Sequence, residues 1–135
     1  MAKTSIGDPL RRKNVALTPE ETVRQWFISV LRDTMKVPEH MMRSEVGFNW
    51  GKSSKRYRAD IVIFGRDASP VALVECKRPE IKLDAEVLGQ ALRYDMALSV
   101  KWVFITNGKN TIVAKKSADG LVFSPSLPSY EDLLK

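Results

Sequence analysis

The chain has 135 residues, of which 22 are Lys or Arg, 16 are Asp or Glu and one is His, so its formal net charge at pH 7 is +6. This length suits a single domain and leaves no room within it for a motor or a second catalytic module. A hydrophobic fraction of 44% with 28% charged residues is typical of a globular protein and excludes a disordered tail.

The same sequence excludes three classes of protein. The apolar runs are only a few residues long, as at residues 61–64, so no transmembrane helix fits. The first twenty residues carry several charges and no apolar segment, so we expect no secretory signal. Cys76 is the single cysteine, which excludes an internal disulfide and a cysteine-rich zinc site. We therefore expect a cytoplasmic domain that does not bind membranes, and its positive charge makes a polyanion a candidate partner.

The chain is expected to begin with a flexible arm that is followed by a helix. Residues 1–17 mix charge with few apolar residues, so we assign them to a flexible basic N-terminal arm and residues 18–135 to a single domain. Thr18 and Glu21 form a T-x-x-E capping box, which marks the start of a helix. Apolar residues then recur at three- and four-residue spacing, which predicts an amphipathic helix that ends at about residue 35.

The middle of the chain is predicted to form three strands. Residues 42–50 alternate imperfectly between apolar and polar side chains, as in a strand with one solvated face. A polar, basic loop over residues 51–58 leads to strands at residues 59–64 and 71–77, which a turn rich in Gly, Asp, Ser and Pro separates. Both later strands are apolar on both faces, which is typical of central strands that are covered on each side.

The remaining elements follow in the last third of the chain. They are a long helix, a buried strand, its hairpin partner after an Asn-Gly turn, a short strand and a closing helical turn, at residues 83–99, 102–106, 111–114, 121–123 and 129–134. The main order is α-β-β-β-α-β-β without an internal repeat. This order favours an α/β fold in which α-helices flank a mixed β-sheet.

Three charged residues lie at the ends of the two apolar strands. Side chains alternate along a strand, so Glu75 and Lys77 point the same way while Cys76 points the opposite way, into the core. Asp60 stands near the start of the preceding strand. If the two strands are antiparallel neighbours, Asp60, Glu75 and Lys77 converge at one rim of the sheet. Charge at such a place is costly unless it is paired, bound to a metal or open to solvent.

This set of groups suits the hydrolysis of a phosphodiester bond. Two neighbouring carboxylates repel each other and favour a bound cation. Oxygen ligands from Asp60, Glu75 and a backbone carbonyl, which we assign to Cys76, suit Mg²⁺, with Mn²⁺ as a substitute. Such an ion lowers the pKa of bound water and stabilises charge on a phosphoryl oxygen, and Lys77 can hold the attacking water. The alternative for these residues is a structural ion pair at a strand end.

The same residues resemble the D…(D/E)-x-K signature of the PD-(D/E)XK nuclease superfamily. More narrowly, the chain resembles the N-terminal nuclease domain of type I restriction enzyme R subunits. Five ordered segments carry this resemblance, namely Thr18–Gln25, Arg58–Val62, Val74–Pro79, the Q-x-x-x-Y pair Gln90 and Tyr94, and Thr106–Gly108. The resemblance covers roughly residues 18–110.

The resemblance implies a restriction-endonuclease-like fold and a metal-dependent deoxyribonuclease. In that family the residues matching Asp60 and Glu75 hold the metal, and the residue matching Lys77 is catalytic. The resemblance places Gln90 near the metal, where it orients water or DNA. Tyr94 lies one helical turn later and is assigned a hydroxyl contact with nucleic acid, with half-buried packing as the alternative.

The identity of a third acidic residue in the site stays open. The family has an acidic residue on its first helix that often approaches the metal, and Glu21 is our candidate for this place. The capping box explains Glu21 without any such role. Glu45, on the first predicted strand, is the competing carboxylate.

Basic residues flank the proposed site. Four of them precede Asp60 and one follows Lys77, which makes all five candidates for contacts with the phosphates of a nucleic acid. They are Lys52, Lys55, Arg56, Arg58 and Arg78. A solvated loop is the alternative for the four that precede Asp60.

The expected activity is DNA hydrolysis without the ATPase motor of the R subunits. The only phosphate-loop-like segment, which ends in Gly51-Lys52-Ser53, has Val46 where a Walker A loop needs glycine, so we expect no ATP site. DNA is the expected partner, and cutting both strands would require a homodimer or recruitment to a larger complex. The alternatives are a catalytically silent nucleic-acid-binding or regulatory module of the same fold, and an RNA-directed nuclease.

Overall fold

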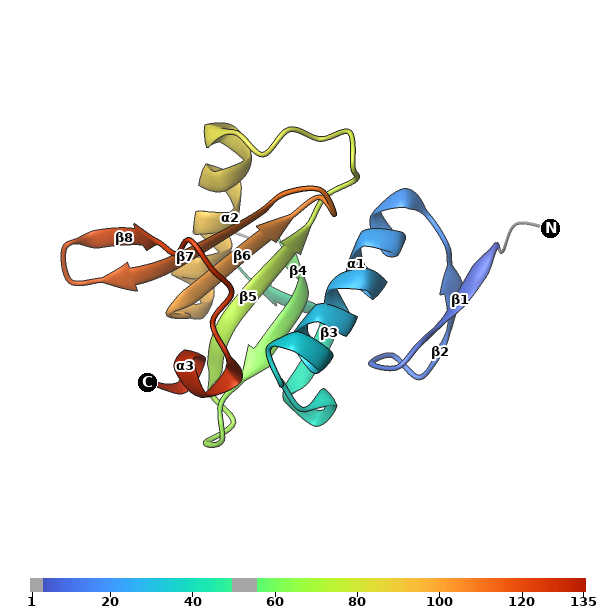
Figure 1. Ribbon diagram of the computed structural model, residues 1–135, viewed down its shortest axis with the longest axis horizontal. Coiled ribbons are helices and arrows are strands. Elements are labelled where there is room, and N and C mark those ends of the chain that lie inside the picture. Colours follow the sequence, from blue (N-terminus) through green and yellow to red (C-terminus); the bar gives the residue numbers. More distant parts are fainter. Residues whose placement is uncertain (1–3, 50–55) are drawn as a thin grey trace.

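The computed structural model describes residues 4–49 and 56–135, with the side chains of these residues except 48–49, 56–57 and 94–98. Its centre is a six-stranded mixed sheet with the order β3-β4-β5-β6-β7-β8 (Figure 1). The strands are β3 (Met42–Asn49), β4 (Arg56–Phe64), β5 (Pro70–Cys76), β6 (Trp102–Thr106), β7 (Thr111–Ser117) and β8 (Gly120–Phe123). β5 and β6 are parallel, and the other neighbouring pairs in this sheet are antiparallel.

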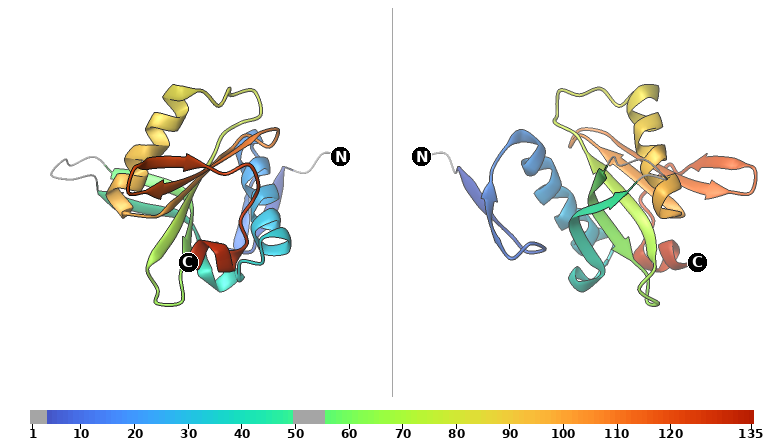
Figure 2. Two further views of the ribbon diagram at one scale, coloured as in Figure 1. Left: turned by 60° about the vertical axis from the view of Figure 1, so that its left-hand side comes forward. Right: turned by 180° about the vertical axis from the view of Figure 1, so that it is seen from behind.

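Helices cover both faces of this sheet. α1 (Pro19–Ser29) and the short α3 (Tyr130–Leu134) pack on one face, and α2 (Ala85–Leu98) packs on the other (Figure 2). α1 continues into a π-helical turn, η1 (Val30–Thr34), and a 3₁₀ turn, η2 (Glu39–Met41), precedes β3. This arrangement confirms the predicted α/β fold with a mixed sheet flanked by helices. Within the described ranges, no helix combines the length and the apolar character that crossing a bilayer requires.

Each face of the sheet has its own apolar core. The larger core joins α1 to the sheet, with Phe27 and Leu31 in the same cluster as Ile61, Val74 and Phe104. The smaller core lies under α2 and contains the buried residues Ala59, Val62, Leu73, Ala91, Val100, Val103 and Ile105. Because β4 and β5 contribute side chains to both cores, they are covered on both faces, as their sequences predicted.

The start of α1 follows the prediction except for one half of the capping box. The Oγ1 atom of Thr18 accepts a hydrogen bond from the backbone N–H of Glu21 at 3.1 Å. The Thr18 N–H, however, donates to the carbonyl oxygen of Ala16 and not to Glu21. The Glu21 carboxylate instead accepts hydrogen bonds from Arg11 at 2.6 Å and from Gln25 at 3.0 Å. The helix start therefore leaves Glu21 available for long-range contacts.

The N-terminal segment contains a hairpin that the sequence pattern did not predict. β1 (Ser5–Asp8) and β2 (Lys13–Ala16) pair as a separate antiparallel sheet. The hairpin lies beside α1, at the end of the molecule opposite β7 and β8 (Figure 1). Its connecting loop approaches the body of the protein, because Leu10 packs against the larger core.

One predicted boundary is wrong in a way that bears on the site. Residues 56–58 belong to β4 and not to the preceding loop, because they pair with residues 47–49 of β3. Arg58 is therefore held on a strand. The rest of the predicted basic loop, including Lys52 and Lys55, lies outside the described residues.

Candidate active site

The two predicted metal ligands lie on neighbouring strands. Ile61 of β4 pairs with Val74 of β5 in the antiparallel register. Asp60, which precedes Ile61, and Glu75, which follows Val74, are the next residues on the same side of that pair. Both residues are nearly buried, with relative exposures of 8% and 5%. Two buried carboxylates this close require positive charge beside them, since an unpaired buried charge is strongly unfavourable.

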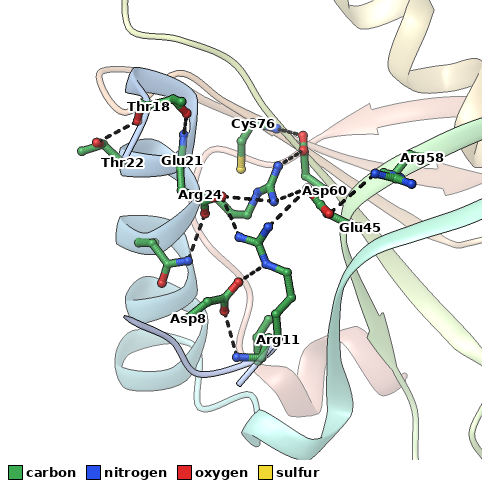
Figure 3. Close-up of polar contacts among 12 residues, drawn as sticks. Asp8, Arg11, Thr18, Glu21, Thr22, Arg24, Glu45, Arg58, Asp60 and Cys76 are labelled. Atoms are coloured by element: carbon green, nitrogen blue, oxygen red, sulfur yellow. Dashed lines mark hydrogen bonds and ion pairs between the residues drawn. The ribbon is translucent and has the colours of Figure 1, made fainter. Parts of the chain in front are cut away.

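Asp60 has a partner at each carboxylate oxygen. Oδ1 accepts a hydrogen bond from Arg24 Nη2 at 2.8 Å, and Oδ2 accepts one from the backbone N–H of Cys76 at 2.7 Å (Figure 3). Burial nevertheless raises the pKa of Asp60, and the Cys76 N–H and the Arg24 charge only partly oppose this effect. The Cys76 thiol itself is buried in the larger core, as its place on the strand predicted.

Glu75 is less well satisfied than Asp60. Its Oε1 atom is buried and has no hydrogen-bond partner, and its Oε2 atom lies 3.7 Å from the ammonium nitrogen of Lys77. Burial, followed by the negative charge of Asp60, raises the pKa of Glu75 to about 8. The Lys77 side chain is partly exposed, so it sits between the buried pair and solvent. Glu75 therefore lacks a full counter-charge.

Arg24 of α1 connects Asp60 with two further carboxylates. Its guanidinium group is 2.8 Å from Asp60, 3.1 Å from Glu45 and 3.5 Å from Glu21 (Figure 3). Burial opposes its charge, but the surrounding carboxylates together raise the pKa of Arg24. Arg24 is a site residue that the sequence pattern did not predict. The available signal was its position three residues before Phe27, on the buried stripe of the helix.

Arg11 approaches the same carboxylates from the hairpin loop. It pairs with Asp8, with Glu21 at 2.6 Å and with Glu45 at 3.3 Å. Burial opposes ionisation of Glu45, but the hydrogen bond from Arg24 and the neighbouring positive charges together lower its pKa. Arginines therefore pair with both Glu21 and Glu45, the two candidates for a third acidic residue. We define the arginine–carboxylate network as Asp8, Arg11, Glu21, Arg24, Glu45 and Asp60.

Glu20 is an acidic residue that the sequence analysis did not consider for the site. Burial is the main cause that raises the pKa of Asp60 and Glu75, and the negative charge of Glu20 raises both further. Glu20 lies one helical turn before Arg24, and this i, i+4 relation is the signal that could have identified it. Among the residues that the structure describes, no three His, Cys, Asp or Glu side chains are grouped closely enough to hold a metal ion.

Gln90 is not joined to the acidic pair. It lies exposed on α2, which packs on β5 and β6. In the described part of the chain, no hydrogen bond connects the Gln90 side chain with Asp60 or Glu75. Its predicted role at the metal remains a prediction.

The predicted nucleic-acid contacts are only partly described. Arg58 and Arg78 have exposed side chains, and they lie 3.7 Å from Glu45 and 4.0 Å from Glu80, respectively. The side chains of the other candidates lie outside the described part of the structure, and these are Lys52, Lys55, Arg56 and Tyr94.

Comparisons with known proteins point to one family. The family model for "Type I restriction enzyme R protein N terminus (HSDR_N)" matches residues 19–128. Among solved structures, the fold is similar to a fragment of a putative HsdR subunit of a type I restriction enzyme from Vibrio vulnificus YJ016, with 22% sequence identity and a TM-score of 0.67. This match covers 87% of the present chain and 24% of that chain, so the protein spans about a quarter of that structure's length. No curated protein matches the sequence.

Proposed function

Because the chain belongs to the family of type I restriction enzyme R protein N termini, we propose that it is a nuclease domain that hydrolyses DNA phosphodiester bonds with a divalent metal ion. The observation that carries the proposal is the buried pair of Asp60 and Glu75 on neighbouring strands, with Lys77 beside Glu75. A merely structural ion pair would leave both oxygens of Glu75 satisfied. Instead, Oε1 has no partner, which fits a site for a cation.

The residues present suit Mg²⁺, with Mn²⁺ as a substitute. Asp60, Glu75 and the backbone carbonyl of Cys76 would hold the ion, which supplies positive charge that activates water and stabilises a phosphoryl oxygen. Lys77 would orient the attacking water and add positive charge near the phosphate. The charge of Arg24 would favour the ionised form of Asp60, and its hydrogen bond would fix the orientation of the carboxylate. Arg24 occupies one lone pair of Oδ1 and the Cys76 N–H one of Oδ2, so each oxygen keeps a lone pair for the ion.

Glu20 is a further candidate for the third acidic residue of the site. The Glu21 carboxylate already accepts hydrogen bonds from Arg11 and Gln25. The charge of Glu20, in contrast, acts on both Asp60 and Glu75. We therefore add Glu20 to the candidates for contact with water or the ion, while Glu21 anchors Arg11.

DNA would approach this rim along exposed basic side chains. Arg58 and Arg78 flank the acidic pair in sequence, and both are exposed. Lys52, Lys55, Arg56 and Tyr94 remain proposed contacts of the same kind, and Gln90 a proposed support for the water or the DNA. One active site cuts one strand, so double-strand cleavage would require a homodimer or a larger restriction complex. The proposal includes no use of ATP by this domain.

A nuclease assay with matched variants tests the proposed function. Wild-type protein should cut linear, nicked, branched or single-stranded DNA in Mg²⁺ or Mn²⁺ and should not cut in EDTA. Lys77→Ala and Asp60→Ala should lower the rate by about 10²-fold or more. Arg32→Ala, which removes an exposed ion pair with Glu39, a residue outside the site, should leave the rate unchanged.

Two outcomes of this assay would favour the alternatives. Binding of DNA without any cleavage across these substrates and metals would support a catalytically silent binding or regulatory module. Preferential cleavage of RNA, when RNA competes with DNA in the same reaction, would support an RNA-directed nuclease.

A further inference from the structure

A shallow apolar groove lies next to the proposed active site. Its volume is about 330 Å³, and we name it the Trp26 groove after the tryptophan that exposes 45% of its surface there. The residues that line it are Thr22, Val23, Trp26, Pro79, Asn107, Gly108 and Lys109. A tryptophan on an amphipathic helix would ordinarily be buried, because its indole is mostly apolar. Its exposure in a groove therefore suggests a ligand.

Hydrogen bonds and close packing fix the wall of the groove that lies opposite α1. Asn107 is buried, its Nδ2 donates to the carbonyl oxygen of Ile81 at 2.9 Å, and its Oδ1 accepts from the backbone N–H groups of Lys109 and Asn110. Gly108 has a φ of +87° and lies so close to α1 that an added Cβ would stand 3.3 Å from Val23. These contacts preform the groove. They also explain the Thr106–Gly108 motif, which packs the turn after β6 on α1.

The groove is joined to the end of β5, the strand that carries Glu75. The backbone N–H of Lys77 donates to the carbonyl oxygen of Thr106 at 2.8 Å, so the end of β5 is bonded to the strand that leads into the groove wall. Pro79, which lines the groove, follows Lys77 by two residues. A DNA strand that contacts Lys77 would therefore lie close to the groove.

The charge at the rim suits a nucleic acid. Lys109 lines the groove, and among the described residues no carboxylate pairs with it. Arg78 has an exposed side chain on the same segment as Pro79. An aromatic, apolar surface with a lysine in its lining and an arginine next to Pro79 in the chain matches a stacked base with phosphates on either side.

We propose that the Trp26 groove binds one unpaired base of the DNA strand, stacked on the indole of Trp26, with the flanking phosphates at Lys109 and Arg78. The inference rests on the proposed function, since it places the base beside the bond to be cut. The groove is large enough for one base and too small for a duplex. The enzyme should therefore favour substrates with frayed, nicked or single-stranded DNA near the scissile phosphate.

The test measures binding separately from cleavage. All proteins carry Lys77→Ala so that DNA stays intact in Mg²⁺, and fluorescence anisotropy reports the affinity for a labelled single-stranded oligonucleotide. Adding Trp26→Ala should weaken binding by about 5- to 100-fold, the usual effect of losing one stacked base. Trp26→Phe should retain most of the affinity. Phe123→Ala removes another exposed aromatic ring, on β8, and should change nothing.

An abasic oligonucleotide completes the test. If stacking is the cause, Trp26→Ala should have little effect on abasic DNA, because the base that the indole would contact is absent. An equal loss with abasic and normal DNA, or no loss with either, would overturn the inference and would favour an apolar protein partner at the groove. Failure of the proposed function looks different: wild type would then cut no DNA in either metal, whatever effect Trp26→Ala has on binding.

Discussion

At the scale of single residues, Glu75 is the group that the fold accommodates least well in the absence of a cation. Burial and the charge of Asp60 raise its pKa from an ordinary 4.5 to about 8. Below pH 4.5 the carboxyl is protonated in both the folded and the unfolded protein and does not affect stability. As pH rises toward 8, the unfolded state loses the proton while the folded state retains it, so the free energy of unfolding falls.

Replacing Glu75 should therefore stabilise the protein that contains no metal. Glu75→Gln removes the ionisation but keeps the shape, and we expect the melting temperature in EDTA at pH 8 to rise by about 2–6 °C. At pH 4 the same substitution should have little effect. Thermal unfolding at both pH values checks this, and Mg²⁺ should stabilise the wild type but not the variant. A lower melting temperature for Glu75→Gln at pH 8 would contradict the account.

Arg24 should be far more important for stability than an arginine on the surface. Its side chain is 7% exposed and contacts three carboxylates, whereas that of Arg32 is 40% exposed and contacts Asp33 and Glu39. Arg24→Met would leave buried carboxylates without their counter-charge, at a cost of about 3 kcal/mol. Arg32→Met should cost about 1 kcal/mol or less. Urea unfolding at neutral pH compares them, and equal losses would show that the arginine–carboxylate network is not effectively buried.

Some residues of the site can be recognised from the sequence, and others cannot. Asp60, Glu75 and Lys77 interrupt strongly apolar strands, and a charge in such a run is conspicuous. Arg24 and Glu20 lie on a helix, where charged residues are common and usually solvated. Only the packing of α1 beside β4 brings Arg24 and Glu20 near the buried carboxylates. The tertiary contact, and not the local pattern, gives them their role.

At the scale of elements, the same distinction separates the strands that could be predicted from the hairpin that could not. β4 and β5 are covered on both faces, so continuous apolar runs identified them. β1 and β2 have only four residues each and contribute no such run. Their loop turns through Arg12 with a φ of 55°, without the Asn-Gly or Gly signal of a tight hairpin. Arg11 and Leu10 attach the hairpin to the body by contacts that are distant in sequence.

Two glycines on elements near the site should respond to alanine in opposite directions. Gly89 lies inside α2, where an added Cβ would meet no atom within 4 Å. Gly89→Ala should therefore stabilise the protein by about 0.5–1 kcal/mol, because alanine favours the helix. Gly108 needs its φ of +87° and contacts Val23, so Gly108→Ala should destabilise by roughly 1–2 kcal/mol. Chemical unfolding of both variants checks the signs, and stabilisation by Gly108→Ala would contradict the packing of this turn on α1.

At the scale of the whole molecule, charge is strongly separated. Six of the 16 acidic residues, but only three of the 22 basic ones, lie in the site, which here means the arginine–carboxylate network together with Glu20, Glu75 and Lys77. The remaining 19 basic and 10 acidic residues give the rest of the chain a larger positive surplus than the net charge of +6 suggests. The general surface would therefore attract DNA, while the proposed site, at which the phosphate would have to arrive, would repel it.

A divalent ion should remove this repulsion, which leads to a prediction about binding and not only about cleavage. Mg²⁺ ordinarily weakens DNA binding, because it competes with the protein for phosphates. In the Lys77→Ala background, we expect Mg²⁺ instead to strengthen binding by about 10-fold, equivalent to roughly 1.4 kcal/mol. Anisotropy titrations at constant ionic strength measure this change.

The matched control is Asp60→Asn with Glu75→Gln in the same background. This variant lacks both the proposed ligands and their negative charge, so it should bind DNA more tightly than its parent without metal. Mg²⁺ should then only weaken its binding, as competition for phosphate requires. If Mg²⁺ weakened binding equally in both proteins, the acidic pair would not be the place at which a cation meets the DNA. The opposite signs expected for the two proteins thus separate a metal at the site from general screening of the surface charge.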